Sequence, residues 1–195
     1  MANVDIPSIA SSNPVGFWGW PETVTSKGGS EPGALARAFG TVLEGLTFYD
    51  LANAVTAEVR VKVAFEEFGR VKRAQLAKLE AVAPPGTKDA AKWPGIFPLD
   101  AVSKVDCYVC GYTVDAKALP NQCPKCGAAR YAFEKEIALS KVWEIAVDAG
   151  RKSAALFREA AAQTQRRARA VLEELAREEE EHASDADRQL AELRT

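Results

Sequence analysis

The four cysteines of this chain fall within one short stretch, as two Cys-x-x-Cys pairs that are each followed by glycine. The first pair is Cys107 and Cys110, and the second is Cys123 and Cys126. A two-residue spacer lets both thiolates of a pair face the same side of a tight turn, so that two pairs can surround one ion. Two disulfides are the alternative, but they would not require this paired spacing. The pattern therefore predicts one metal site with four sulfur ligands, which suits either zinc or a single iron ion.

Other residues of the same stretch are as characteristic as the cysteines. Tyr112 follows the first pair and its glycine, Pro124 lies within the second pair, and Pro120 and Phe133 flank that second pair. With these residues, the segment 105–133 resembles the rubredoxin-like module of rubrerythrins. The resemblance implies one iron ion that is held by the four cysteines and changes between the ferric and ferrous states. The spacing by itself leaves zinc open.

The composition argues against two classes of partner. The formal net charge is −2 and the pI is about 5.6, so neither nucleic acid nor an anionic membrane surface is indicated as a partner. Residues 1–7 carry no basic segment or apolar core, and charged residues interrupt the apolar runs, so we expect neither a secretory signal nor a membrane span. Free thiolates that bind a metal fit a reducing compartment. We therefore expect a soluble, cytoplasmic protein.

The N-terminal segment differs in composition from the rest of the chain. Residues 1–30 are rich in proline and glycine, which predicts an extended arm instead of a helix. The arm also carries Phe17, Trp18 and Trp20, and so many aromatic side chains are unusual in a solvated tail. They would bind to the helices of the same chain, or to a second subunit or partner protein. We expect the first of these, or a homo-oligomer contact.

Two pairs of helices are predicted, one on each side of the cysteine module. Ser30 is a typical capping residue, and apolar residues recur at helical spacing over 31–83, with a break at which Thr56 would cap the second helix. Residues 84–104 begin with a proline and glycine cluster and are predicted to be a linker. The helical spacing returns over 134–195. The fold class is therefore mainly α, a four-helix bundle with the module inserted between its two helical hairpins.

The two hairpins also resemble each other, as the hairpins of ferritin-like bundles do. Residues 44–48 align with 153–157, and residues 65–69 align with 172–176. A ferritin-like di-iron site takes one Glu from the first helix of each hairpin and a Glu-x-x-His from the second. Glu44 matches the first-helix Glu, and Glu179 and His182 match the Glu-x-x-His. The similarity to rubrerythrins thus extends, more weakly, over residues 31–194.

Three of the six ligand positions carry other residues. Lys72 and Gln75 stand where the second Glu-x-x-His is needed, and Ser153 stands where a Glu is needed. A di-iron centre carries about four to six positive charges, which the three remaining ligands cannot neutralise in an apolar interior. We therefore expect no di-iron centre in the bundle.

Lys72 suggests how the remaining carboxylates are neutralised. Its ammonium is predicted to lie between Glu44 and Glu179, because an unpaired buried carboxylate is strongly destabilising. Two alternatives stay open: the alignment is shifted and Lys72 is exposed, or a shift of helix register brings Glu144 or Asp148 inward as a ligand.

The expected function is one-electron transfer through the four-cysteine iron, to or from a partner oxidoreductase, with no catalytic residue. The bundle would serve as a scaffold and as the surface of a homo-oligomer. One alternative is a rubrerythrin-type peroxide reductase that uses a residual metal site at Glu44, Glu179 and His182. The other is a structural role, with zinc bound by the cysteines and the protein acting as an assembly subunit of a larger oxidoreductase complex.

Overall fold

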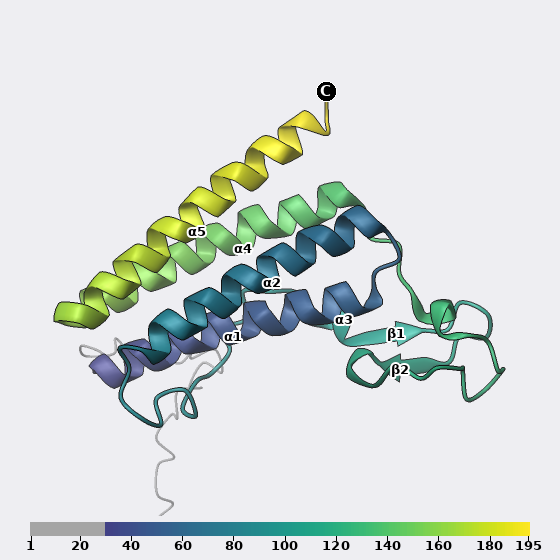
Figure 1. The fold of residues 1–195 in the computed structure, drawn as a ribbon, viewed down its shortest axis with the longest axis horizontal. Helices are drawn as coiled ribbons and strands as arrows, with labels where there is room; N and C mark the ends of the chain where they lie inside the picture. The colour runs from purple at the N-terminus through teal and green to yellow at the C-terminus, as the bar shows by residue number, and fades with distance from the viewer. Residues whose placement is uncertain (1–29) are drawn as a thin grey trace, which may run out of the picture.

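The computed structural model describes residues 30–195, so the arm residues Phe17, Trp18 and Trp20 lie outside the described residues. Long helices make up most of the described chain, which confirms the predicted mainly α fold (Figure 1). They are α1 (Glu31–Val55), α2 (Val59–Glu80), α4 (Leu139–Ala162) and α5 (Arg166–Glu192). α1 packs on α2, α4 packs on α5, and contacts between α1 and α4 join the two pairs. None of the helices within residues 30–195 combines the length and the apolar run that a membrane span requires.

The ends of α1 show one correct and one wrong capping prediction. Ser30 caps α1 as predicted, since its Oγ accepts a hydrogen bond from the Gly33 N–H at 3.4 Å. Thr56 does not cap α2, because its hydroxyl donates instead to the Ala52 carbonyl of the preceding turn at 2.6 Å. The Glu58 carboxylate caps α2 by accepting from two N–H groups of its first turn.

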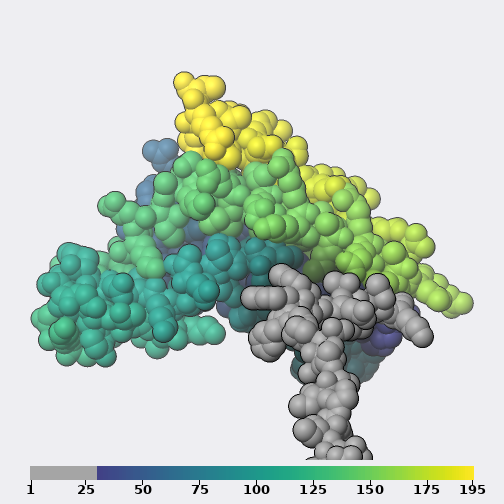
Figure 2. Space-filling model, turned by 180° about the vertical axis from the view of Figure 1, so that it is seen from behind, coloured from purple at the N-terminus to yellow at the C-terminus, as the bar shows by residue number. Residues whose placement is uncertain are grey.

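The cysteine module lies between α2 and α4 in the sequence and forms a lobe at one end of the helices (Figures 1 and 2). The module and the residues just before it form a short helix, a small antiparallel sheet and two turns of 3-10 helix: α3 (Asp100–Ser103), β1 (Lys104–Asp106), β2 (Thr113–Asp115), η1 (Ala116–Ala118) and η2 (Arg130–Phe133). Val105 lies opposite Val114 in the sheet. The lobe is tied to the end of α1, because the Lys135 N–H donates to the Val55 carbonyl at 2.7 Å.

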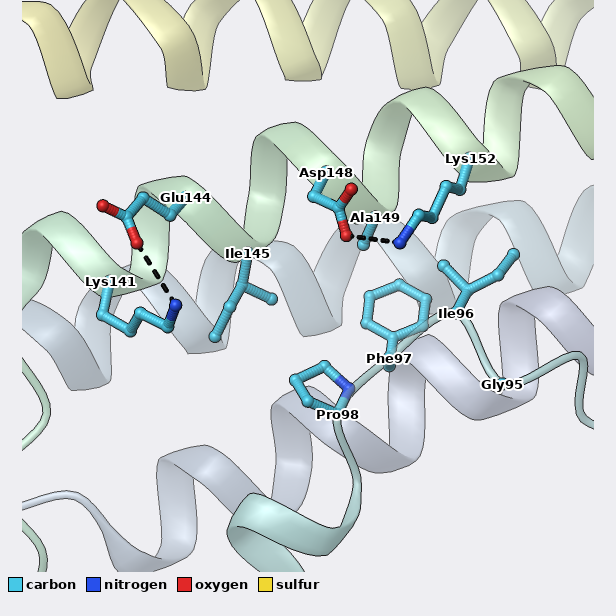
Figure 3. A pocket seen from close by; sticks show the side chains of 10 residues that line it. All are labelled: Gly95, Ile96, Phe97, Pro98, Lys141, Glu144, Ile145, Asp148, Ala149 and Lys152. Carbon is cyan, nitrogen blue, oxygen red and sulfur yellow. Dashed lines mark hydrogen bonds and ion pairs between the residues drawn. The ribbon is translucent and has the colours of Figure 1, made fainter.

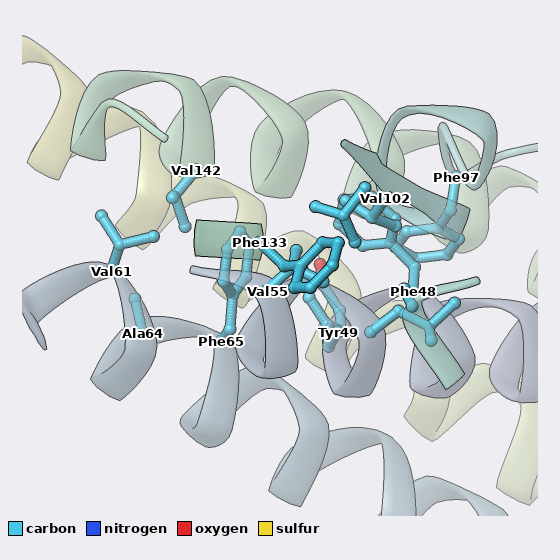
Figure 4. Packing of buried hydrophobic residues seen from close by; sticks show 14 of the residues in the cluster. Phe48, Tyr49, Val55, Val61, Ala64, Phe65, Phe97, Val102, Phe133 and Val142 are labelled. Atoms are coloured by element: carbon cyan, nitrogen blue, oxygen red, sulfur yellow. The ribbon is translucent and has the colours of Figure 1, made fainter. Parts of the chain in front are cut away.

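The described residues form two large apolar clusters and a small third one of Ala146, Val147 and Ala186. The first lies at the module end and joins the helices to the lobe, with Phe48, Phe65, Phe97 and Phe133 at its centre (Figure 4). The second lies at the other end of the helices and includes Leu35, Phe39, Leu79, Phe157, Leu172 and Leu175. The module is therefore packed against the helices, because its apolar core is continuous with theirs.

A polar layer interrupts this apolar interior. We use this name for five buried residues: Glu44, Lys72, Gln75, Ser153 and Glu179. In α1, α2 and α4, the residues of the polar layer lie in sequence between members of the first cluster and members of the second. Most buried polar groups in proteins have hydrogen-bond partners, so the contacts of this layer decide what it can do.

The segment predicted as a linker packs closely against α1. Two glycines of α1 make room for it: a Cβ at Gly40 would lie 1.9 Å from the Lys92 carbonyl oxygen, and one at Gly45 would lie 2.7 Å from the Phe97 ring. Phe97 is buried in the first apolar cluster. The backbone next to Phe97 is therefore held at a defined place beside α1.

Candidate metal centre

Two turns of the same form carry the four cysteines. In the first turn, the Gly111 N–H donates to the Cys107 carbonyl at 2.7 Å, and in the second, the Gly127 N–H donates to the Cys123 carbonyl at 2.8 Å. The two glycines have φ values of +69° and +75°, a backbone conformation that side chains with a Cβ rarely adopt. Each turn thus reverses the chain within one Cys-x-x-Cys-Gly unit, and both of its sulfurs point to the same side.

Backbone hydrogen bonds hold the two turns in place. The Cys107 N–H donates to the Tyr112 carbonyl at 2.9 Å, and the Cys123 N–H donates to the Ala128 carbonyl at 2.7 Å. The Tyr108 N–H donates to the carbonyl of Ala132, in η2, at 2.9 Å. The first turn is therefore tied both to itself and to the end of the module, which fixes the direction of its thiols.

The four thiols converge on one point. The Sγ atoms of Cys107 and Cys126 are 3.8 Å apart, those of Cys110 and Cys123 are 3.6 Å apart, and all four lie within 4.8 Å of one another. A tetrahedron with metal–sulfur bonds of about 2.3 Å has sulfurs about 3.8 Å apart, so this donor set fits one zinc or iron ion. The cysteines are free thiols, and the four predicted ligands do come together.

The pKa values of two of the thiols are shifted in opposite directions by their surroundings. Burial raises the pKa of Cys110 to about 12. Hydrogen bonds with the other thiols also raise it, whereas a hydrogen bond from the Tyr112 N–H lowers it. Burial also acts on Cys123, but N–H groups of Cys126 and Lys125 directed at its sulfur lower its pKa to about 7. N–H groups that point at a sulfur stabilise a thiolate, which is the form that binds a metal.

One side of the centre faces the core, and the other faces solvent. Cys107 and Cys123 are buried in the first apolar cluster, whereas Cys126 is exposed. The nearby side chains of Tyr108 and Tyr131 are 69% and 62% exposed. An ion held by the four sulfurs would therefore lie close to the surface, although half of its ligand shell is covered by protein.

Glu44, a predicted metal ligand of the bundle, is hydrogen-bonded to backbone N–H groups. Its two carboxylate oxygens accept from the N–H groups of Gly95, Ile96 and Phe97 at 3.1, 3.3 and 3.3 Å. Sequence reasoning missed these donors, because any residue can supply a backbone N–H. The available signal was Gly45, a glycine in the middle of an apolar helix, which marks a close approach of another part of the chain.

Glu179 has the partner that was predicted for it. The Lys72 ammonium donates to Glu179 Oε1 at 2.7 Å, and the Gln75 amide donates to the same oxygen at 2.5 Å. The Lys72 and Glu179 side chains are each 4% exposed, so the alternative of a solvent-exposed Lys72 is wrong. The prediction that Lys72 also neutralises Glu44 is not supported, since the backbone N–H groups of residues 95–97 hold that carboxylate.

His182 is half-buried beside this ion pair. Together with Tyr49, Lys72 and Glu179 it lines a cavity of about 20 Å³, which is room for about one water molecule. Among residues 30–195, only the four cysteines form a group of three or more His, Cys, Asp and Glu residues that could hold one ion. The structure therefore does not bring Glu44, Glu179 and His182 together as a ligand set.

The proposed substitute ligands of α4 face away from the polar layer. Glu144 and Asp148 line a groove of about 500 Å³ between α4 and residues 95–98 (Figure 3). There Glu144 pairs with Lys141 at 3.2 Å, and Asp148 pairs with Lys152 at 2.7 Å. The alternative of a register shift that brings one of them inward is wrong, because Ser153 is the residue of this region that is buried in the layer.

Comparison with known proteins agrees with the geometry of the module. The family model described as "Rubrerythrin, rubredoxin-like domain" matches residues 106–134, a range that includes all four cysteines. Searches of curated proteins and of solved structures found no match to the chain. Residues 106–134 are therefore similar to the rubredoxin-like domain of rubrerythrins, a module whose four clustered cysteines suggest iron or zinc binding.

Proposed function

We propose that this protein is a one-electron carrier with a single iron ion bound by Cys107, Cys110, Cys123 and Cys126. The observation that supports this proposal best is the convergence of the four sulfurs, all within 4.8 Å of one another, at a site with one face close to the surface. Four thiolates complete the coordination of the ion and leave no position for a substrate, so electron transfer is favoured over catalysis at this centre. Iron bound in this way gains or loses one electron without changing its ligands.

The residues around the thiols have separate tasks in this function. Cys107 and Cys123 are covered by the first apolar cluster, which keeps water from one side of the site. Backbone N–H groups directed at Cys123 stabilise negative charge on its sulfur, and such hydrogen bonds set the potential of an iron–sulfur centre. Exposed Tyr108 and Tyr131 would contact a partner oxidoreductase that gives or takes the electron.

The bundle has a supporting role in this proposal. We take it to be a ferritin-like four-helix bundle, because the sequences of its two hairpins align and because Lys72 and Gln75 of one hairpin donate to the buried Glu179 of the other. It would hold the module and provide the surface of a homo-oligomer in the cytoplasm. A peroxide reductase would need metal at Glu44, Glu179 and His182, and the partners of Glu44 and Glu179 argue against such a site.

The experiment is metal analysis and visible absorption of protein purified without added metal. We expect one iron ion per chain and a red colour that dithionite bleaches, both absent from a Cys107→Ser variant. The control substitution Ser103→Ala, which changes none of the cysteines, should keep both the iron and the red colour. Iron that does not change its oxidation state with dithionite or with a chemical oxidant would contradict electron transfer.

A structural zinc site is the second candidate, and one observation favours it. Cys107 and Cys123 belong to the same apolar cluster as Phe48 and Phe133, so an ion bound there would stabilise one end of the helices as well as the module. In this case the purified protein would be colourless and contain one zinc ion per chain. It would also remain bound to a larger oxidoreductase complex during purification.

A further inference from the structure

The polar layer has the helix pattern of a dinuclear metal site but not its chemistry. α1 contributes Glu44, α2 contributes Lys72 and Gln75, α4 contributes Ser153, and α5 contributes Glu179. In di-iron proteins of the ferritin-like kind, two helices each supply a Glu and the other two each supply a Glu-x-x-His, all pointing inward. Here the same four helices meet, and an ammonium, an amide and a hydroxyl replace three of the ligands.

The layer already contains the positive charge that Glu179 requires. Lys72 and Gln75 both donate to Glu179 Oε1, at 2.7 and 2.5 Å, and the ion pair is almost fully removed from solvent. The Lys72 ammonium also lies 5.6 Å from the centre of the Phe97 ring, which a cation favours. A metal ion next to Glu179 would have to displace this ammonium, and the two layer positions of α2, Lys72 and Gln75, offer it no carboxylate.

Glu44 is satisfied without a cation. The three N–H groups of residues 95–97 point at its two oxygens and hold its negative charge by hydrogen bonds. The same contacts fasten the segment beside α1. Both carboxylates of the layer are thus accounted for, and the residues present do not fit a di-iron centre.

Two fully buried side-chain atoms of the layer make no hydrogen bond in the described part of the chain. The Gln75 Oε1 and the Ser153 Oγ have no hydrogen-bond partner within residues 30–195. Such orphan groups are rare in folded proteins. They occupy the positions at which the di-iron pattern has a His and a Glu, and a water-sized cavity lies beside Lys72 and Glu179. Two of the three replaced positions thus carry a buried polar atom without a partner within residues 30–195.

We propose that the polar layer is a converted dinuclear metal site, in which the Lys72 ammonium supplies the charge that metal would otherwise supply. The bundle then folds without metal, and three substitutions at Lys72, Gln75 and Ser153 are enough to restore metal binding. The proposal concerns the bundle alone and holds whether the cysteines bind iron or zinc, so it can fail independently of the proposed function.

The first test removes the ammonium. Lys72→Met keeps the length of the side chain and leaves Glu179 buried without a cation, so the Tm should fall by about 10 °C. Lys152→Met is a matched control: its ion pair with Asp148 has the same 2.7 Å separation, but the two side chains are 56% and 62% exposed. The control should shift the Tm by less than about 2 °C. Equal shifts in the two variants would overturn the proposal.

A double variant keeps this test decisive if Lys72→Met does not fold. Lys72→Met combined with Glu179→Gln removes both charges, so it should fold and recover most of the lost Tm. A double variant that is as unstable as Lys72→Met alone would show that charge compensation is not the role of Lys72.

The second test restores the ligands. The variant with Lys72→Glu, Gln75→His and Ser153→Glu should bind two more Co²⁺ ions per chain than the parent protein, with the four-cysteine site occupied in both. Metal content and the visible bands of Co²⁺ with nitrogen and oxygen ligands measure this binding, and circular dichroism checks the helices. Folding that requires Co²⁺ would also support the proposal. A folded variant that binds no more Co²⁺ than the parent, or one that stays unfolded with Co²⁺ present, would overturn it.

Discussion

Four thiols of the module converge within 4.8 Å on a point that suits a metal ion, whereas Glu179 of the bundle has an ammonium of the same chain 2.7 Å away. Thiolates that close together repel one another, so we expect the module to need a cation from outside. In the polar layer, Glu179 is paired with Lys72, and Glu44 accepts hydrogen bonds from the N–H groups of residues 95–97. The comparison indicates that dependence on metal is a property of one region, although both regions share an apolar core.

Removal of the metal should have the largest effect: it should unfold the module while the helices stay folded. Structural metal sites of this kind contribute about 10–16 kcal/mol to folding, so a strong chelator or Cys123→Ser should unfold residues 104–134. Helical circular dichroism should remain close to that of the parent. Hydrogen exchange measured along the chain checks both expectations. Helices that unfold together with the module would contradict the division between the two regions.

The shared core can be tested at Phe133, which lies in the module and packs in the first apolar cluster. Phe133→Ala removes a fully buried ring, so the free energy of unfolding should fall by about 3–5 kcal/mol. Urea unfolding followed by circular dichroism measures this loss. Tyr131→Ala, at an exposed neighbour in η2, is the control and should cost less than about 0.5 kcal/mol. Similar losses in both would mean that the module packs only loosely on the helices.

A substitution at Glu44 tests whether backbone N–H groups stabilise this buried carboxylate without a metal ion. Glu44→Gln removes the negative charge and one acceptor oxygen, so at least one N–H of residues 95–97 loses its partner. Hydrogen bonds to charged groups contribute about 1.5–3 kcal/mol, and we expect a loss of about 2 kcal/mol in thermal unfolding. Glu80→Gln, which breaks an exposed pair with Lys88, is the control. Faster proteolysis within residues 84–99 should accompany the loss in Glu44→Gln and not in the control.

The smallest expected effect is a pH dependence from Tyr49, next to the polar layer. Burial, and then the charge of Glu179, raise the pKa of the Tyr49 hydroxyl in the folded protein. The unfolded chain therefore loses this proton first, and stability should fall as the pH rises above about 10, by up to about 1.4 kcal/mol per pH unit. Tyr49→Phe should remove this slope, whereas Tyr108→Phe, at an exposed site, should keep it. An unchanged slope in Tyr49→Phe would mean that another group causes it.

The metal centre could be predicted because its determinants are local in the sequence. A Cys-x-x-Cys-Gly unit forms its turn from its own residues, since only glycine readily adopts the φ of Gly111 and Gly127. Helical periodicity likewise predicted the long helices. The cap of α2 was assigned wrongly to Thr56, because its hydroxyl had a choice between the next helix and the carbonyl of the previous turn.

The sequence alone thus determined the four-sulfur ligand set and the long helices. Only the tertiary structure decided how the bundle carboxylates are neutralised. Lys72 and Glu179 are 107 residues apart in the chain, and Glu44 and Gly95 are 51 residues apart. Which groups pair over such distances depends on how α2, α5 and the segment beside α1 pack. Every residue except proline has a backbone N–H, so the residue type does not reveal that this group binds a carboxylate.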